Sequence, residues 1–197
     1  MSVAVINVGV GNTASVMFAL ERLGAAATLT ADPKRVAEAE RLILPGVGAA
    51  VAAMRVLQGE LRDVLVGFKR PMLGICLGQQ LFYDYSQEGG AAGLGLLRGE
   101  VTALEGSRRL PTPHMGWSPL RIDRENVLLE GVQTNDYVYF VHSYACPVDG
   151  ATVATAKYGR MFAAVVAQDN VFGCQFHPER SGAVGARVLR NFLDLPC

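Results

Sequence analysis

Nearly continuous runs of apolar residues alternate with helix-like segments through the first half of the chain. Such runs are typical of parallel strands that are buried on both faces, whereas the segments between them repeat apolar residues every three or four positions, as helices do. The expected strands cover residues 2–8, 26–30, 41–44 and 71–75, and the expected helices cover residues 13–23, 33–39, 49–69 (one or two helices) and 77–85.

From about residue 100 the pattern changes to short apolar segments in which helical spacing is scarce. Together with the first half, this pattern predicts an α/β fold with an open, mostly parallel sheet flanked by helices and an additional β-rich C-terminal half. The expected strands of this half cover residues 101–104, 118–122, 137–141, 153–156, 162–167 and 171–176, and a closing helix covers residues 183–193.

The composition favours one compact domain over residues 1–197. Hydrophobic residues make up 50% of the chain and charged residues 18%, which supplies a core and gives little sign of disorder. The 18 basic residues equal the 18 acidic ones, so no bulk charge attracts nucleic acid or an anionic membrane. No apolar run approaches the roughly 20 residues that span a bilayer.

The four cysteines, Cys76, Cys146, Cys174 and Cys197, are scattered without the pairing typical of metal sites. No basic N-terminal stretch precedes a long apolar signal segment. We therefore expect a cytoplasmic protein that needs no metal and no organic cofactor.

One cysteine lies where a predicted strand ends and a predicted helix begins. Cys76 is flanked by Gly74 and Gly78, which permit the tight turn of a nucleophile elbow and push the central side chain into the open. The N-terminus of the following helix favours a thiolate at this position. A free cysteine is nevertheless often no more than a small buried hydrophobic residue. A catalytic role for Cys76 therefore also requires a general base elsewhere in the chain.

His177 is the candidate base, because it directly follows an apolar strand. Pro178 disfavours a helical conformation at His177, and Glu179 is then placed to accept a hydrogen bond from the far ring nitrogen. A lone histidine is more often structural than catalytic. Together, Cys76, His177 and Glu179 supply a nucleophile, a base and an orienting group.

The Gly-x-Cys-x-Gly elbow and the late His-Pro-Glu resemble the hallmarks of class I glutamine amidotransferase domains, in the expected order and over essentially the whole chain. The resemblance implies a flavodoxin-like fold, and Cys76, His177 and Glu179 as a triad that hydrolyses L-glutamine to glutamate and ammonia. It also implies a set of residues that hold the glutamine. These are Gly48, Gln80, Glu88, His142, Ser143 and Tyr144.

Two backbone N–H groups are candidates for the oxyanion hole that amide hydrolysis requires. Leu77 N–H lies at the start of the helix, and Val47 N–H lies in the Pro-Gly-Val-Gly segment after a strand. Glycines on both sides let the peptide planes at Val47 reorient. We therefore expect competent and incompetent states of this loop, selected by a partner or an acceptor substrate, although an ordinary tight turn is the alternative.

Segments 45–48, 114–117 and 139–144 are similar to motifs of glutaminase subunits of imidazole glycerol phosphate synthases, which act in histidine biosynthesis. This resemblance implies a heterodimer with a (β/α)₈-barrel cyclase subunit that receives the ammonia. Residues on loops expected near the triad are candidates for the interface, since aromatic and arginine side chains are common anchors. They are Asn12, Met115, Trp117, Tyr139 and Arg180.

Three other interpretations remain open at this point. In the first, the chain is the glutaminase subunit of another amidotransferase, such as anthranilate or aminodeoxychorismate synthase. The acceptor that reacts with the ammonia would distinguish these enzymes. A cysteine peptidase or acyl hydrolase with the same elbow would act without glutamine preference and without a partner. A non-catalytic binding module would tolerate the replacement of Cys76 by alanine.

Overall fold

The computed structural model describes residues 2–9, 13–46 and 48–196. Its main sheet is parallel from β2 to β14 and antiparallel from there to β9. The strand order is β2 (Ala27–Thr30), β1 (Val3–Ile6), β3 (Arg41–Leu44), β4 (Met72–Ile75), β14 (Val171–Cys174), β13 (Arg160–Gln168), β12 (Thr152–Tyr158) and β9 (Arg121–Ile122).

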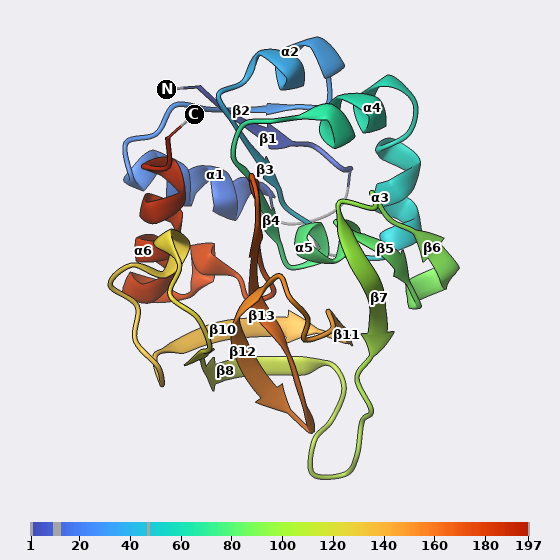
Figure 1. Ribbon diagram of the computed structural model, residues 1–197, viewed down its shortest axis with the longest axis vertical. Coiled ribbons are helices and arrows are strands. Elements are labelled where there is room, and N and C mark those ends of the chain that lie inside the picture. The colour runs from blue at the N-terminus through green and yellow to red at the C-terminus, as the bar shows by residue number, and fades with distance from the viewer. Residues whose placement is uncertain (1, 10–12, 47, 197) are drawn as a thin grey trace.

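Helices cover both faces of the parallel part, as Figure 1 shows. One face packs against α1 (Thr13–Arg22) and α6 (Gly182–Leu193), and the other packs against α2 to α5. Alternate residues of one strand serve the two cores: Leu42 and Leu44 of β3 face α2 to α5, whereas Ile43 faces α1 and α6. The remaining helices on the second face are α2 (Pro33–Glu38), α3 (Ala50–Val56), α4 (Glu60–Gly67) and α5 (Leu77–Leu81).

Two smaller sheets flank the main one. The antiparallel ribbon of β8 (His114–Pro119) and β10 (Tyr137–His142) lies beneath the parallel strands in Figure 1. The other sheet has the order β11 (Tyr144–Ala145), β7 (Leu97–Ala103), β5 (Tyr83–Ser86) and β6 (Ala91–Ala92). Short 3₁₀ turns are η1 (Glu88–Gly90), η2 (Val127–Leu129) and η3 (Pro178–Arg180).

The fold class predicted from the sequence is confirmed, but the helix expected over residues 77–85 is wrong in its second half. Helix α5 ends at Leu81, and the next residues form β5, which pairs with β7. The carbonyl groups of Leu81 and Phe82 accept hydrogen bonds from the N–H groups of Leu94 and Leu96 and so do not continue a helix. Tertiary pairing thus overrides the local helical pattern.

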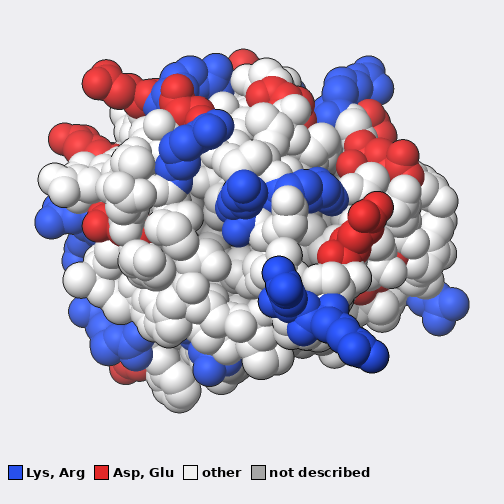
Figure 2. All heavy atoms as spheres, turned by 90° about the horizontal axis from the view of Figure 1, so that it is seen from below, with Lys and Arg blue, Asp and Glu red and all other residues white. Residues whose placement is uncertain are grey.

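None of the described helices is long and apolar enough to cross a bilayer. On the face seen in Figure 2, acidic and basic side chains both occur, in places side by side, and much of the remaining surface is uncharged.

Candidate active site

The cysteine elbow is held by two close backbone approaches. Cys76 has φ +54°, a left-handed conformation that is strained for a side chain other than glycine. A Cβ atom at Gly78 would lie 1.7 Å from the carbonyl oxygen of Leu44, and one at Gly74 would lie 2.6 Å from the backbone nitrogen of Gln79. Both glycines are therefore required for α5 to start immediately after β4.

The Cys76 side chain is buried, which corrects the expectation of a thiol in the open: only 4% of the residue is exposed. Strand β10 covers it, because the Cys76 thiol donates to the carbonyl oxygen of Val141 at 3.7 Å. On the other side, the amide Nε2 of Gln175 donates to Cys76 Sγ at 3.6 Å. The sulfur still lines a pocket, so a small molecule in that pocket could contact it.

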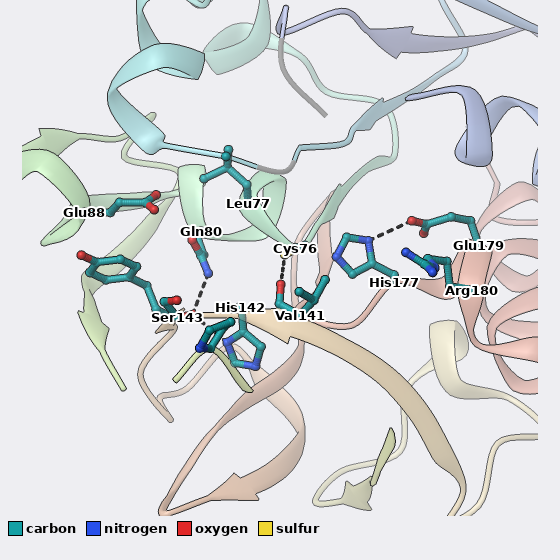
Figure 3. Close-up of a pocket in the computed structure, with 13 residues that line it drawn as sticks. Cys76, Leu77, Gln80, Glu88, Val141, His142, Ser143, His177, Glu179 and Arg180 are labelled. Carbon is teal, nitrogen blue, oxygen red and sulfur yellow. Dashed lines mark hydrogen bonds and ion pairs between the residues drawn. The ribbon is translucent and has the colours of Figure 1, made fainter. Parts of the chain in front are cut away.

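His177 lies beside Cys76 because β14 and β4 are neighbouring parallel strands, paired in register at Cys174 and Ile75. Both residues thus follow the carboxyl ends of adjacent strands, where sites of open α/β sheets cluster. In Figure 3 the His177 ring lies between Cys76 and Glu179. Its Nδ1 is 2.8 Å from Glu179 Oε1, the contact expected from the sequence.

The electrostatics of this histidine favour its charged form. The side chains of His177 and Glu179 are 5% and 2% exposed. Burial opposes the imidazolium, but the neighbouring Cys76 sulfur and the Glu179 carboxylate outweigh burial and raise the pKa of His177 to about 10. The other ring nitrogen, Nε2, is buried and has no hydrogen-bond partner among the described residues. It is therefore free to exchange a proton with the neighbouring Cys76 sulfur.

Strand β10 is fixed directly to the His177 segment. The N–H of His177 donates to the carbonyl oxygen of Tyr139 at 2.9 Å, and the N–H of Tyr139 donates to Ser181 Oγ at 3.0 Å. The Ser181 hydroxyl in turn donates to the carbonyl oxygen of His177 at 2.7 Å. The backbone of β10 consequently contacts both the cysteine and the histidine of the site.

The pocket in front of Cys76 has a volume of about 410 Å³. Every residue expected from the sequence to hold glutamine lines it, as do all three members of the expected triad. Pro113 also lines it, a position that no sequence motif indicated. The lining residues expected to hold glutamine are Gly48, Gln80, Glu88, His142, Ser143 and Tyr144.

Gln80 and Glu88 both present polar side chains to this pocket (Figure 3), and each is held by hydrogen bonds to neighbouring groups. Gln80 Nε2 donates to the carbonyl oxygen of Tyr144 at 2.8 Å and to Gln175 Oε1 at 3.1 Å, which leaves its Oε1 as an acceptor. Glu88 Oε2 accepts from the N–H of Ala50 at 2.8 Å, and burial raises the pKa of its carboxyl group. Two oxygen acceptors in one pocket suit the ammonium group of an amino acid.

Gln175 is a candidate site residue that the sequence reasoning missed. It is fully buried and joins the nucleophile to the substrate pocket, because it donates to Cys76 Sγ and accepts from Gln80. Its place two residues before His177 was the available signal, since side chains two positions apart on an extended segment point to the same side.

One expected oxyanion donor is occupied. Leu77 N–H donates to the carbonyl oxygen of Gly46 at 3.3 Å, so this N–H does not point freely into the pocket. A Cβ atom at Gly46 would lie 3.0 Å from Leu77 Cβ, which shows how closely the two segments approach. The second expected donor, Val47, lies outside the described residues.

Three of the expected interface residues, Met115, Trp117 and Tyr139, lie on the β8–β10 ribbon, and Arg180 lies on η3 next to Tyr139. Met115 and Trp117 are 63% and 53% exposed, and the Trp117 and Tyr139 rings meet edge to face with centroids 5.9 Å apart. The Arg180 guanidinium lies 4.9 Å from the Tyr139 ring centroid. Asn12 lies outside the described residues.

Among the described residues, no group of three or more His, Cys, Asp or Glu side chains is arranged to hold a metal ion. The site thus offers a thiol, an imidazole–carboxylate pair and polar acceptors as its chemical groups.

Comparison with known proteins decides the family. The model of the glutamine amidotransferase class-I family matches residues 4–195. The chain belongs to the class I glutamine amidotransferases. It is accordingly an enzyme with glutaminase activity, and the alternatives of a peptidase or a non-catalytic binding module are set aside.

Curated relatives narrow the position within this family. The imidazole glycerol phosphate synthase subunit HisH of Vibrio cholerae is 44% identical over 201 residues, covering 98% of each chain. The corresponding subunit of Yersinia pestis is 44% identical over 197 residues, covering 99% of this chain and 100% of its own.

Solved structures of more distant amidotransferases share the fold. A crystal structure of a glutamine amidotransferase superposes with a TM-score of 0.75 at 20% identity, covering 98% of this chain and 97% of its own. The structure of PurLQS from Thermotoga maritima gives a TM-score of 0.70 at 18% identity, with the same coverage.

Proposed function

We propose that this amidotransferase is the glutaminase subunit of an imidazole glycerol phosphate synthase and that Cys76, His177 and Glu179 carry its chemistry. The observation that carries the residue assignment is that one pocket is lined by Cys76, by His177, whose Nε2 is unpartnered, and by Glu179, which is bonded to His177 Nδ1. Identity to HisH subunits along the whole chain carries the choice of synthase.

In the proposed reaction, the proton of the Cys76 thiol has already passed to His177 Nε2, as the raised pKa of this histidine favours, and the sulfur attacks the side-chain amide carbon of glutamine. The tetrahedral oxyanion collapses, the C–N bond breaks, and His177 protonates the departing ammonia. Water then attacks the glutamyl thioester while His177 accepts its proton. Glutamate leaves, and the Cys76 thiolate and the His177 imidazolium are restored.

The state of the elbow suggests how a partner controls this reaction. Leu77 N–H is engaged by the Gly46 carbonyl and must be released before it stabilises an oxyanion. Gly48, two residues after this carbonyl group, has φ +113°, a conformation that glycine adopts readily and other residues rarely do. Binding of the partner or its acceptor then selects the state with a free donor, so the isolated chain hydrolyses glutamine slowly.

The partner is a cyclase subunit with a (β/α)₈-barrel fold that forms a heterodimer with this chain and receives the ammonia. The exposed cluster of Met115 and Trp117, with Tyr139 and Arg180, supports a docking surface beside the pocket. A reducing cytoplasm suits the enzyme, because the nucleophile must remain a free thiol.

The test mixes the chain with a purified cyclase subunit and measures glutamate release with and without the cyclase's phosphoribosyl acceptor. The proposal predicts acceptor-stimulated release that is lost in Cys76→Ala. Stimulation by chorismate and its synthase, with none by the cyclase, would instead assign the chain to anthranilate or aminodeoxychorismate synthesis.

A further inference from the structure

Two buried histidines outside the proposed triad contact each other, and one of them, His142, lines the pocket in front of Cys76. His114 and His142 are 2% and 6% exposed and occupy paired positions on β8 and β10. His114 Nδ1 lies 3.0 Å from His142 Nε2. At its far ends this pair contacts Ser118 Oγ, 2.9 Å from His114 Nε2, and the carbonyl oxygen of Tyr144, 2.8 Å from His142 Nδ1.

The Tyr144 carbonyl fixes the direction of this series. A carbonyl only accepts, so His142 Nδ1 carries a hydrogen, and burial, which lowers the pKa of His142 to about 3, keeps the ring neutral. His142 Nε2 therefore accepts, and His114 Nδ1 donates to it. Burial also lowers the pKa of His114 to about 4, so His114 Nε2 accepts from the Ser118 hydroxyl.

Aromatic packing holds the first histidine in place. The His114 ring is stacked on Tyr158 with centroids 4.1 Å apart and on Phe140 with centroids 4.9 Å apart. The His142 ring meets Phe162 edge to face at 5.0 Å. Neither imidazole is thus free to turn and exchange its ring nitrogens.

The series ends on a group that positions Gln80. The Tyr144 carbonyl accepts from both His142 Nδ1 and Gln80 Nε2, which uses both of its lone pairs. Gln80 connects this series to Cys76. Its Nε2 also donates to Gln175, and the Nε2 of Gln175 donates to Cys76 Sγ. An unbroken series of hydrogen bonds joins Ser118 to the nucleophile.

We propose that Ser118, His114 and His142 form a hydrogen-bond relay of fixed direction that positions Gln80 to bind glutamine. This role rests on the glutaminase function proposed above, and it makes the three side chains positioning residues rather than catalytic ones. The relay lies on the inner face of the same ribbon whose outer face carries Met115 and Trp117. It gives both imidazoles a task although neither touches the reacting amide.

The test uses a matched pair at the half-buried end of the relay, Ser118→Val and Ser118→Thr, which have the same shape and differ in one hydroxyl group. With the cyclase subunit present, Ser118→Val is expected to raise the KM for glutamine about 2- to 10-fold, the worth of one net hydrogen bond, with kcat little changed. Ser118→Thr is expected to restore the parental KM. His142→Phe, which removes both hydrogen bonds of the His142 ring, is expected to raise the KM for glutamine more than Ser118→Val does.

Glutamine affinity is measured separately by calorimetry in a Cys76→Ala background, where no turnover occurs. The affinity should fall in Ser118→Val and recover in Ser118→Thr. Equal affinities in the two variants, or a loss confined to kcat, would overturn the relay. If the parental chain binds glutamine but does not hydrolyse it in the presence of the cyclase, the proposed function is overturned. The binding comparison between the Ser118 variants still tests the relay in that case.

Discussion

The two halves of the molecule build the site in different ways. In the parallel half, Cys76 is placed by its own neighbours, because two glycines allow a strained turn between β4 and α5. In the β-rich half, hydrogen bonds between segments distant in sequence place His177, which donates to Tyr139 of β10, and the Tyr144 loop, which accepts from Gln80. A nucleophile is thus encoded locally, whereas the groups that activate it and hold its substrate depend on long-range contacts.

The largest effect is expected at the locally encoded residue. Cys76→Ala removes the attacking atom and should lower kcat for glutamine hydrolysis about 10⁴-fold or more in the complex with the cyclase. This kcat is measured as glutamate release in the presence of the acceptor. Cys174→Ala, a buried cysteine of the adjacent strand, is the control and should retain turnover. Turnover that survives Cys76→Ala would contradict the assigned nucleophile.

The next effect concerns the orienting carboxylate of the β-rich half. Glu179→Gln keeps the shape but removes the charge that helps to raise the pKa of His177, and should lower kcat by about 10² to 10⁴. Because the imidazolium then loses its proton more readily, the alkaline limb of the pH–rate profile should move to lower pH. Glu130→Gln, an exposed carboxylate elsewhere, should leave both unchanged. An unshifted limb in Glu179→Gln would contradict the account.

Gln175 tests whether long-range contacts reach the nucleophile itself. Gln175→Leu preserves buried volume but removes the donor to Cys76 Sγ and the acceptor for Gln80, so kcat/KM should fall about 10- to 100-fold. The alkylation rate of Cys76 by iodoacetamide should fall as well. Gln79→Leu, which removes a buried amide bonded to Ala163, should lower stability and leave that rate intact.

The exposed face of the ribbon should matter for assembly alone. Trp117→Ala removes a large exposed side chain next to Tyr139 and is expected to weaken cyclase binding by about 1–3 kcal/mol, measured as a Kd by calorimetry. Val127→Ala, equally exposed on η2, is the control and should leave the Kd unchanged. Equal Kd values for Trp117→Ala and the parental chain would remove this ribbon from the proposed interface.

The last effect is on stability rather than on activity and is a dependence on acid. Burial lowers the pKa values of His114 and His142, so below about pH 6.5 the unfolded chain binds protons that the folded chain does not. The free energy of unfolding should therefore fall as pH drops from about 6.5 toward 4, by at most about 1.4 kcal/mol per pH unit for each histidine. In urea titrations, His114→Phe should show a shallower fall. If the free energy of unfolding of His114→Phe fell with pH as steeply as that of the parental chain, the assignment of His114 and His142 as a neutral pair would be contradicted.

The sequence predicted the features that depend on adjacent residues. The alternation of strands and helices predicted the fold class, and Cys76, His177 and Glu179 were proposed as a site because each lies just after an apolar strand or within two residues of a partner. The hydrogen bond between His177 and Glu179 was predicted on the same ground. Family resemblance added the remaining pocket residues.

Features that depend on distant partners were beyond sequence reasoning. Gln175 and Cys76 are 99 residues apart, and no periodicity reports their contact. The error over residues 83–85 has the same origin, because strand pairing between β5 and β7 ended a helix that the local pattern favoured. The occupied Leu77 N–H likewise depends on a carbonyl of another segment, that of Gly46.

The most direct test of the joint site is to trap its covalent intermediate. The complex with cyclase and acceptor is quenched rapidly in acid during turnover of labelled glutamine, and its peptides are mapped by mass spectrometry. We predict a glutamyl label on the peptide that contains Cys76 and none when Cys76 is alanine. Turnover with no label on Cys76, or with the label on Cys146 or Cys174, would contradict the account.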